Sequence, residues 1–390
     1  MLPVSLPKFS LDFPYAYGQP AASASFRVEP EDFKVDETLG FQPVGEGEHV
    51  YLQVWKRGEN TAWVAEKIAE LAKVQVMDVG YCGRKDRHAV TTQWFSVYMP
   101  KKELEPDWFA LNCETINNEA IHSETINSET IDDEAISNEL INSTTINDDS
   151  IKSASLKNDS LKNSSLKNQS IKILSVSRHQ HKLRRGDHET NRFIIRLRDV
   201  DVEDKLAFEQ KIARVLTHGV PNYFGEQRFG RNANNLPEAH AILVDGKRIR
   251  DKQKRGLMLS AARSYLFNQV LAARVLANNW QELLGGEPEQ FPSAPLWGRG
   301  RSTATDAALA LEAEAMNAWA EWRDGLEHVG LLQERRALVL RPDAASWRWL
   351  DNDVELSFSL GSGEFATTVL RELAQLDSAV KTEAVSVWYS

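Results

Sequence analysis

The sequence predicts an α+β fold, with strands and helices mixed along the chain. Three observations lead to this prediction. The chain has 390 residues and is 42% hydrophobic, which allows two domains and a sizeable core. Short runs that alternate between apolar and polar residues are typical of strands, and other stretches carry apolar residues at helical spacing. The two kinds of segment do not follow each other in regular β-α-β order, which favours α+β.

Most predicted strands lie in the first half of the chain. Residues 26–37 are strand-like with a possible turn in the middle, and residues 49–55 alternate as a strand does. Asn60 or Thr61 can cap a helix that runs to about Val74. Two further strands are predicted at 76–82 and 92–98, on either side of a short loop.

Helices become more frequent in the second half. After a strand at 193–197, residues 202–216 form an amphipathic pattern, residues 257–279 a long apolar-periodic helix, and residues 309–323 another helix. Residues 219–235, rich in Gly, Asn and aromatic side chains, begin a different region. Near the C-terminus, two strands within 346–360 precede a helix within 365–374.

The net charge of −10 gives a misleading picture of possible partners. Residues 114–150 carry ten acidic residues and no Lys or Arg, and without them the chain has 46 acidic and 46 basic residues. Nucleic-acid binding depends on local basic patches rather than on the mean charge. The composition therefore does not exclude an RNA partner.

An Ile or Leu recurs at every fifth position from Ile116 to Ile171, separated mainly by Asn, Ser, Thr, Glu, Asp and Lys. A period of five matches neither a helix nor a strand. A pentapeptide β-helix would bury Glu114, Glu119 and Glu124 without partners, which is costly. We therefore expect residues 113–172 to be a low-complexity, mostly disordered insert, with a short solenoid as the alternative.

Other sequence features restrict the class of protein. No run of eighteen apolar residues is present, so no membrane span is expected, and the N-terminus lacks a signal-peptide core. With only Cys82 and Cys113, the chain cannot build a disulfide scaffold or a four-cysteine zinc site, which fits a cytoplasmic location.

The segment most indicative of chemistry is GYCGRKDRHAVTTQWFSV, residues 80–97. It places Asp86 among four potential cations directly after a small-residue turn. Nearby positive charge keeps a carboxylate ionised, and the same cations can hold a phosphate backbone. Asp86 is thus a candidate nucleophile or proton acceptor located where a polyanion would bind. The alternative is a solvated charge run on a loop.

This segment resembles the signature of the TruD family of tRNA pseudouridine synthases, in which the Asp of G-x-K-D-R-x-A is the nucleophile. Five further stretches match the family in the same order. They are RVEPEDFKVDE (27–37), GEGEHVYLQVWKRGENT (45–61), KLRRGDHETNRFIIRLR (182–198), GVPNYFGEQRFGR (219–231) and FSLGSGEFATTVLREL (358–373). Six ordered matches over nearly the whole chain are far more specific than one.

The resemblance implies a fold and a domain layout. It implies a pseudouridine-synthase catalytic core with a mixed or antiparallel sheet, formed by residues 1–218 and 342–390. An inserted, mostly helical TRUD domain would occupy residues 219–341. The family has only a short connection where the five-residue repeat lies, so residues 113–172 depart from its pattern.

The resemblance also implies an activity. It implies the isomerisation of uridine to pseudouridine at position 13 of tRNA, with Asp86 as nucleophile and no cofactor or metal. The implied partner is tRNA, and the oligomeric state is not predicted. A rival of another class is a non-catalytic RNA-binding protein that retains the same cleft. A metal-dependent hydrolase ranks last because metal ligands are missing.

Four further residues have a structural and a functional interpretation. Phe33 and Phe365 are either ordinary packing residues or substrate contacts, and each matches a substrate-contact position of the family. Asn191 either caps a turn or reads a uracil edge or ribose hydroxyl, and the family string assigns it to substrate. Phe193 either packs under the uracil or belongs to the core. Lys85 and Arg87 are possible supporting residues.

Basic residues cluster in two places. Alternate Arg side chains along a strand can follow phosphates, or they can form a solvated basic edge. The first cluster contains Arg178, Lys182, Arg184, Arg185, Arg192, Arg196 and Arg198, and the second Lys247, Arg248, Arg250, Lys252, Lys254 and Arg255. A metal site at His179, His181 and His188 is rejected because cations surround them and no acidic or Cys ligand completes the set.

Overall fold

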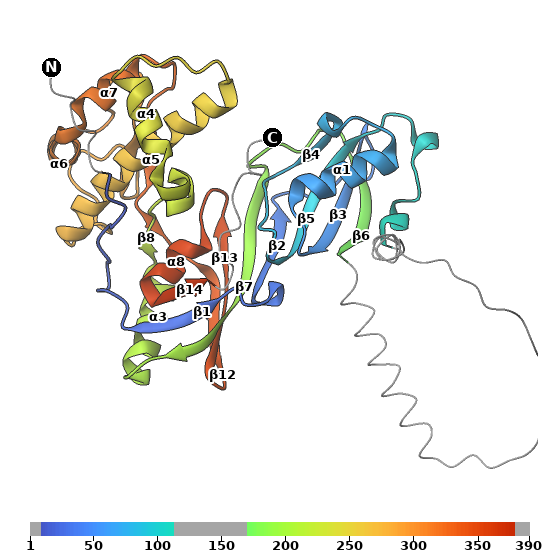
Figure 1. Cartoon of the computed structure of the whole chain (residues 1–390), viewed down its shortest axis with the longest axis horizontal. Helices are drawn as coiled ribbons and strands as arrows, with labels where there is room; N and C mark the ends of the chain where they lie inside the picture. Colours follow the sequence, from blue (N-terminus) through green and yellow to red (C-terminus); the bar gives the residue numbers. More distant parts are fainter. Residues whose placement is uncertain (1–8, 113–169, 379–390) are drawn as a thin grey trace, which may run out of the picture. The chain divides into compact units, whose positions relative to one another are not determined.

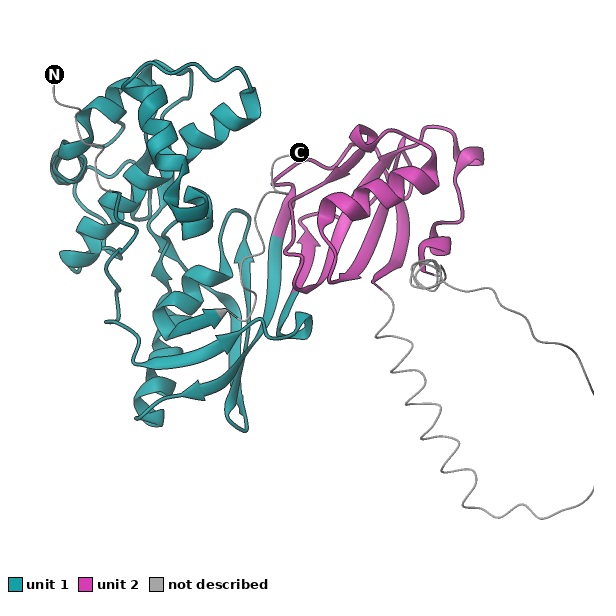
Figure 2. Ribbon diagram, in the orientation of Figure 1, with its two compact units in different colours: residues 1–34, 190–390 teal, residues 35–189 magenta. Residues whose placement is uncertain are grey.

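The computed structural model describes residues 9–112 and 170–378. The chain divides into two compact units (Figure 2). Unit 1 comprises residues 1–34 and 190–390, and unit 2 comprises residues 35–189. Both contain strands and helices, so the α+β prediction is confirmed (Figure 1).

Unit 2 is a sheet covered on one face by a helix. The strand order is β2-β5-β3-β6, β4 adds to β5, and β3 pairs antiparallel with both β5 and β6. The elements are β2 (Phe33–Leu39), β3 (His49–Arg57), α1 (Thr61–Ala72), η2 (Val76–Asp78), β4 (Val79–Tyr81), β5 (Val90–Tyr98), η3 (Lys102–Leu104), η4 (Trp108–Asn112) and β6 (Ile171–His179).

Helix α1 forms where the sequence predicts it. The Asn60 side chain accepts a hydrogen bond from the Trp63 backbone N–H at 2.8 Å and caps the helix, and Lys73 ends it in the left-handed conformation. Its Val64 and Ile68 pack on apolar residues of β3 and β5. The strand predicted at 76–82 is shorter than expected, because the Asp78 carboxylate accepts the Gln75 N–H and folds residues 76–78 into a 3₁₀ turn.

Unit 1 contains a second group of strands in the order β12-β13-β7-β1-β14. All pairs are antiparallel except β1 with β14, which is parallel. The arrangement is thus mixed, as expected. These elements are β1 (Ala22–Phe26), η1 (Pro30–Asp32), β7 (His188–Asp201), α3 (Lys205–His218), β12 (Asp343–Leu350), β13 (Asp353–Gly361), α8 (Ala366–Leu373) and β14 (Ala374–Ser378).

Residues 219–341 of unit 1 are mostly helical and surround a core that Phe13 also joins. Long helix α5 contributes Leu259, Tyr265 and Phe267 to it. The elements are β8 (Val220–Pro221), η6 (Glu226–Phe229), η7 (Arg231–Ala233), α4 (Asn235–Leu243), α5 (Lys252–Leu276), β9 (Ser293–Leu296), α6 (Asp306–Ala315), η8 (Asn317–Trp319), α7 (Ala320–Glu327), β10 (Glu334–Ala337) and β11 (Val339–Leu340).

The helical prediction for residues 309–323 is confirmed, but the segment is divided rather than continuous. Helix α6 ends at Ala315, and η8 and α7 follow after a break at Met316, which is fully buried. After the break, the rings of Trp319 and Trp322 both pack on Phe9. Their centroids lie 5.7 and 5.4 Å from the centroid of the Phe9 ring. Packing of large aromatic side chains outweighs continuous helical periodicity here.

The helical region begins and ends at neighbouring strands. β8 pairs antiparallel with β11, so the chain enters and leaves residues 219–341 side by side. Gly219 has φ +83° at this point, and a Cβ there would lie 2.4 Å from the Leu340 carbonyl oxygen. Such adjacency suits an inserted domain. The boundaries at 218/219 and 341/342 stay a prediction, because the division into units falls at 34/35 and 189/190.

The predicted insert lies outside the described residues as far as residue 169, and its last two residues, Ile171 and Lys172, begin β6. The segments that flank it lie close together. The Asn112 side chain bonds the backbone N–H and C=O of Ile173 at 2.6 and 3.5 Å. The Ser170 carbonyl accepts the Arg57 N–H at 2.9 Å. The chain therefore leaves and re-enters at the same end of the sheet.

We expect that replacing residues 113–169 by about eight Gly and Ser residues, which span such a short gap, leaves fold and activity intact. The reason is that Asn112 is already held by Ile173 of β6 and Ser170 by Arg57 of β3. The measurements are the melting temperature and the rate of pseudouridine formation. A large loss of either would show that the segment contributes to folding or to RNA binding.

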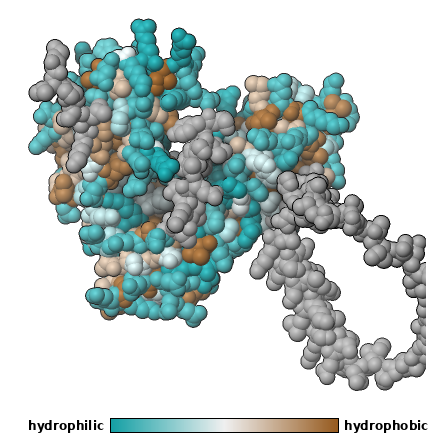
Figure 3. Space-filling view, in the orientation of Figure 1, coloured by the Kyte–Doolittle hydropathy of each residue, from teal (hydrophilic) through white to brown (hydrophobic). Residues whose placement is uncertain are grey.

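Among the described residues, no helix combines the length and apolarity needed to cross a bilayer. On the face seen in Figure 3, hydrophobic residues are interspersed with hydrophilic ones in both units.

Candidate active site

The loop of residues 83–89, which joins β4 to β5 and carries Asp86, is anchored by buried polar side chains of unit 2. The Gly83 carbonyl accepts from Gln93 Nε2 at 3.3 Å, and the Lys85 N–H donates to Thr61 Oγ1 at 2.9 Å. Thr61 Oγ1 in turn donates to Gln93 Oε1 at 2.9 Å. The start of α1 and the middle of β5 therefore fix the backbone on the N-terminal side of Asp86.

Lys56, at the end of β3, anchors Asp86 itself. Its side chain is fully buried, and Nζ donates to the Glu59 carbonyl at 2.7 Å and to the Asp86 carbonyl at 3.0 Å. Burial lowers the pKa of Lys56 to about 8, although the nearby Asp86 charge opposes this shift. Beyond Asp86, the Ala89 carbonyl accepts the Gly58 N–H at 3.2 Å. The loop thus has a rigid backbone, and the Asp86 side chain is half-buried.

Lys85 points into the protein and pairs with Glu37 of β2. Lys85 Nζ lies 2.6 Å from Glu37 Oε2, and both side chains are buried. Glu37 Oε1 also accepts the Trp94 N–H at 3.0 Å. The expectation that Lys85 holds a phosphate is therefore wrong, because its charge is used inside unit 2. Arg87, by contrast, is exposed, and its Nε donates to the Gly58 carbonyl at 3.3 Å.

Glu37 also belongs to a buried group with Cys82 and His188, whose possible ligand atoms lie within 4.8 Å of one another. Within residues 9–112 and 170–378 it is the one such set. Burial, and then the Glu37 charge, raise the pKa of the Cys82 thiol. Since the Lys85 ammonium already balances the carboxylate, this set favours an ion pair rather than a metal centre.

The other predicted site residues lie in unit 1. Phe33 is 2% exposed, and its ring centroid lies 5.9 Å from that of Phe193 and 5.7 Å from that of Phe26. The Arg27 guanidinium lies 4.2 Å from the Phe33 centroid. Phe193 is also buried. Both rings are therefore buried and lie against each other. Asn191 is buried, opposite Leu360 of β13.

Phe365 is the most accessible of the predicted substrate contacts, at 39% exposure, and stands at the N-cap of α8. The turn before it is fixed, because Glu364 Oε2 accepts the Gly361 N–H at 2.8 Å and Arg336 Nη2 donates to the Gly363 carbonyl at 3.1 Å. Arg336 lies over the Phe224 ring, 4.3 Å from its centroid. The helical region thus supports the turn that presents Phe365.

Several arginines of the first basic cluster are paired with acids. Arg196 Nε lies 2.6 Å from Asp353, and Arg198 Nη2 lies 2.8 Å from Asp32. Arg178, which is buried, binds Glu105 and the carbonyls of Gly47 and Met99. Each of these three guanidinium groups is bound by an acid from another segment of the chain. Spacing in the sequence did not reveal acids contributed by other segments.

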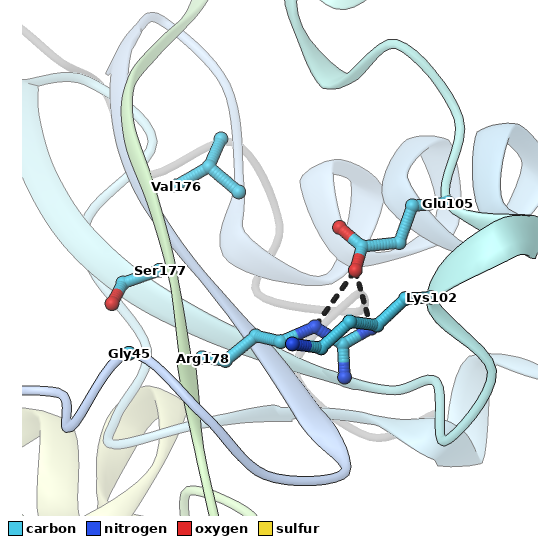
Figure 4. Close-up of a pocket in the computed structure, with 6 residues that line it drawn as sticks. All are labelled: Gly45, Lys102, Glu105, Val176, Ser177 and Arg178. Carbon is cyan, nitrogen blue, oxygen red and sulfur yellow. Dashed lines mark hydrogen bonds and ion pairs between the residues drawn. The ribbon is translucent and has the colours of Figure 1, made fainter.

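A cavity of about 360 Å³ lies beside Arg178 (Figure 4). Its lining consists of Gly45, Lys102, Glu105, Val176, Ser177 and Arg178. Arg178 is opposite Val50 near the start of β3, whereas Lys56 is opposite Ile171 near its end. Six residues of strand separate them, roughly 20 Å. The cavity is therefore distinct from the Asp86 loop. Arg178 there connects β6 to Gly47, Met99 and Glu105 through hydrogen bonds.

Comparison with known proteins decides the family. The model of the family tRNA pseudouridine synthase D (TruD) matches residues 12–131 and 130–249. A tRNA pseudouridine synthase D of Cellvibrio japonicus is 50% identical over 373 residues, covering 95% of this chain and 95% of its own. The chain belongs to the TruD family. The resemblance inferred from the six stretches is thereby confirmed.

Other TruD relatives agree. A tRNA pseudouridine synthase D of Methylococcus capsulatus is 41% identical over 394 residues, covering 94% of this chain and 95% of its own. A crystal structure of a Methanosarcina mazei protein named tRNA pseudouridine synthase D matches with a TM-score of 0.56 at 17% identity, covering 92% of this chain and 95% of that one. The latter supports the fold alone.

Sequence reasoning missed the residues that anchor the loop, namely Lys56, Thr61 and Gln93, and the partner Glu37. One signal was available for Lys56. It falls in phase with Val50, Leu52 and Val54, so a charged residue occupies the apolar face of a strand. Thr61 and Gln93 gave no such signal, because their partners come from other segments.

Proposed function

We propose that this protein isomerises uridine to pseudouridine at position 13 of tRNA, with Asp86 as nucleophile and without a cofactor. The proposal rests on its 50% identity over 95% of the chain to a tRNA pseudouridine synthase D. The Asp86 loop supports it, because a half-buried carboxylate on an anchored backbone suits attack on a bound substrate.

The proposed chemistry balances without an oxidant or a phosphoryl donor. An Asp86 oxygen bonds to C1′ as the N1–C1′ bond breaks, and the bond electrons pass to the uracil. After the base turns, C5 bonds to C1′ and releases the carboxylate, C5 loses its proton, and N1 gains one. The product has the same atoms as uridine. An alternative use of the same carboxylate is removal of a ribose proton.

The target base must leave its stack before reaction, which costs a few kcal/mol. We assign substrate binding to Phe33, Asn191 and Phe365. Phe365 is exposed enough to stack on a base, and the Asn191 amide can read a uracil edge or a ribose hydroxyl. Phe33 and Phe193 pack on each other, so we assign them to the floor of the uracil site.

The two supporting cations have separate roles in this proposal. Lys85, the residue before Asp86, fixes the loop to β2 by its buried ion pair with Glu37. Arg87 is exposed and is suited to bind an RNA phosphate. The proposed partner is tRNA, and the proposed location is the cytoplasm, where tRNA is modified and Cys82 stays a free thiol. We propose no metal and no membrane partner.

The decisive experiment is a map of pseudouridine. Because the isomerisation does not change mass, tRNA from cells with and without the gene is treated with a reagent that tags pseudouridine, and the tags are read by primer extension. We expect a tag at position 13 only when the protein is present. Tight tRNA binding without any tag would instead support the non-catalytic RNA-binding alternative.

A further inference from the structure

Lys56 is a buried cation that the proposed reaction does not use. It lies on the helix-covered face of β3, in phase with three fully buried apolar residues, and is itself 0% exposed. A Lys in such a position is unusual, because taking an ammonium out of water is costly. Replacing it by an apolar residue would complete the face. Its retention needs a reason other than packing.

The contacts of the ammonium supply that reason. Nζ donates to two carbonyls, those of Glu59 at 2.7 Å and Asp86 at 3.0 Å. Glu59 follows the same strand, so its bond is local. Asp86 is 30 residues away, and its bond joins the end of β3 to the residue that carries the reactive carboxylate. A bond from a charged donor is stronger than a neutral one.

We propose that Lys56 is a positioning residue for Asp86, holding its backbone so that the carboxylate meets C1′ of the bound uridine. The inference rests on the function proposed for Asp86 and extends it. Residues 83 and 85 are held by Gln93 and Thr61, but the Asp86 carbonyl itself is held by Lys56. A displacement of the carboxylate by about 1 Å would cost roughly 100-fold in rate.

The pH dependence of the Lys56 charge distinguishes a role in positioning Asp86 from a role in stability alone. Burial lowers its pKa from the ordinary value of 10.5 to about 8. The charges that act on it are Asp86, which raises the pKa, Lys85, which lowers it, and Glu59, which raises it. Between pH 8 and 10.5 the unfolded chain holds the proton that the folded chain has lost. The contribution of Lys56 to stability therefore rises with pH in this range.

Lys56→Met is the test, because it keeps the length of the side chain and removes the charge and the donors. We expect the single-turnover rate at pH 7 to fall roughly 10- to 100-fold, with the tRNA dissociation constant within about twofold of the wild type. The melting temperature should stay within about 5 °C, since the charge removed was a desolvated one.

The pH profile is the second readout. The wild-type rate should fall as pH rises through about 8, while stability does not fall, and the variant should lack this decline. A structural role would instead make rate follow stability. Lys56→Arg, which keeps the charge at all these pH values, should recover part of the rate and remove the decline.

The control is Lys67→Met on α1, which removes a partly exposed Lys of the same unit and should change neither rate nor profile. Wild-type rates and an unchanged profile in Lys56→Met would overturn the inference, and so would a rate loss that merely parallels a lower melting temperature or weaker tRNA binding. A wild-type protein that forms no pseudouridine would instead refute the proposed function, so the two failures are distinguishable.

Discussion

Asp86→Asn is expected to abolish pseudouridine formation while the protein remains folded and bound to tRNA. The amide has the size of the carboxylate but cannot attack C1′, so the single-turnover rate should fall by roughly 10,000-fold or more. The fold should survive because the loop is anchored through main-chain atoms, among them the Asp86 carbonyl held by Lys56. The measurements are tagged pseudouridine per tRNA, the tRNA dissociation constant and the melting temperature.

The matched control is Glu66→Gln, which neutralises an exposed acid on α1 of the same unit and should leave the rate unchanged. A wild-type rate in Asp86→Asn would refute Asp86 as the nucleophile. A loss of tRNA binding equal to the loss of rate would show that Asp86 contributes to affinity instead.

Lys85→Met should produce the largest loss of stability among the substitutions considered. It leaves the Glu37 carboxylate buried, 0% exposed, without the ammonium 2.6 Å away. Breaking a buried ion pair from one side costs about 3–5 kcal/mol in the free energy of unfolding. Because Lys85 precedes Asp86, the same change should also disturb the loop and reduce the rate. Urea unfolding followed by circular dichroism measures the stability.

The double variant Glu37→Gln with Lys85→Met separates the ion pair from the packing. Gln keeps an oxygen for the Trp94 N–H and removes the buried charge, so most of the lost stability should return. The comparison is Lys67→Met, which breaks an exposed pair with Glu70 and should cost less than about 1 kcal/mol. If Lys85→Met costs no more than Lys67→Met, the buried pair does not stabilise the fold as described.

Local sequence was sufficient for several elements. Asn60 and the spacing of Val64 and Ile68 define α1 within two residues of the prediction, because capping and helical periodicity are local properties. The six ordered stretches likewise identified the family, and the G-R-K-D-R-H-A segment supplied Asp86 as the candidate nucleophile. Local pattern failed at Met316, where buried aromatic packing divides one predicted helix into two.

The sequence by itself determined the α+β class, the family and the candidate nucleophile, because each depends on patterns within short stretches and on the order of those stretches along the chain. Only the tertiary structure decided which basic side chains are paired inside the protein and which are exposed to a partner. Lys85 and Arg178 looked alike as RNA-binding cations, yet Glu37 and Glu105, from distant segments, bind them inside unit 2. It also revealed that Lys56 holds Asp86. Pairing of this kind depends on long-range contacts, which a one-dimensional pattern does not contain.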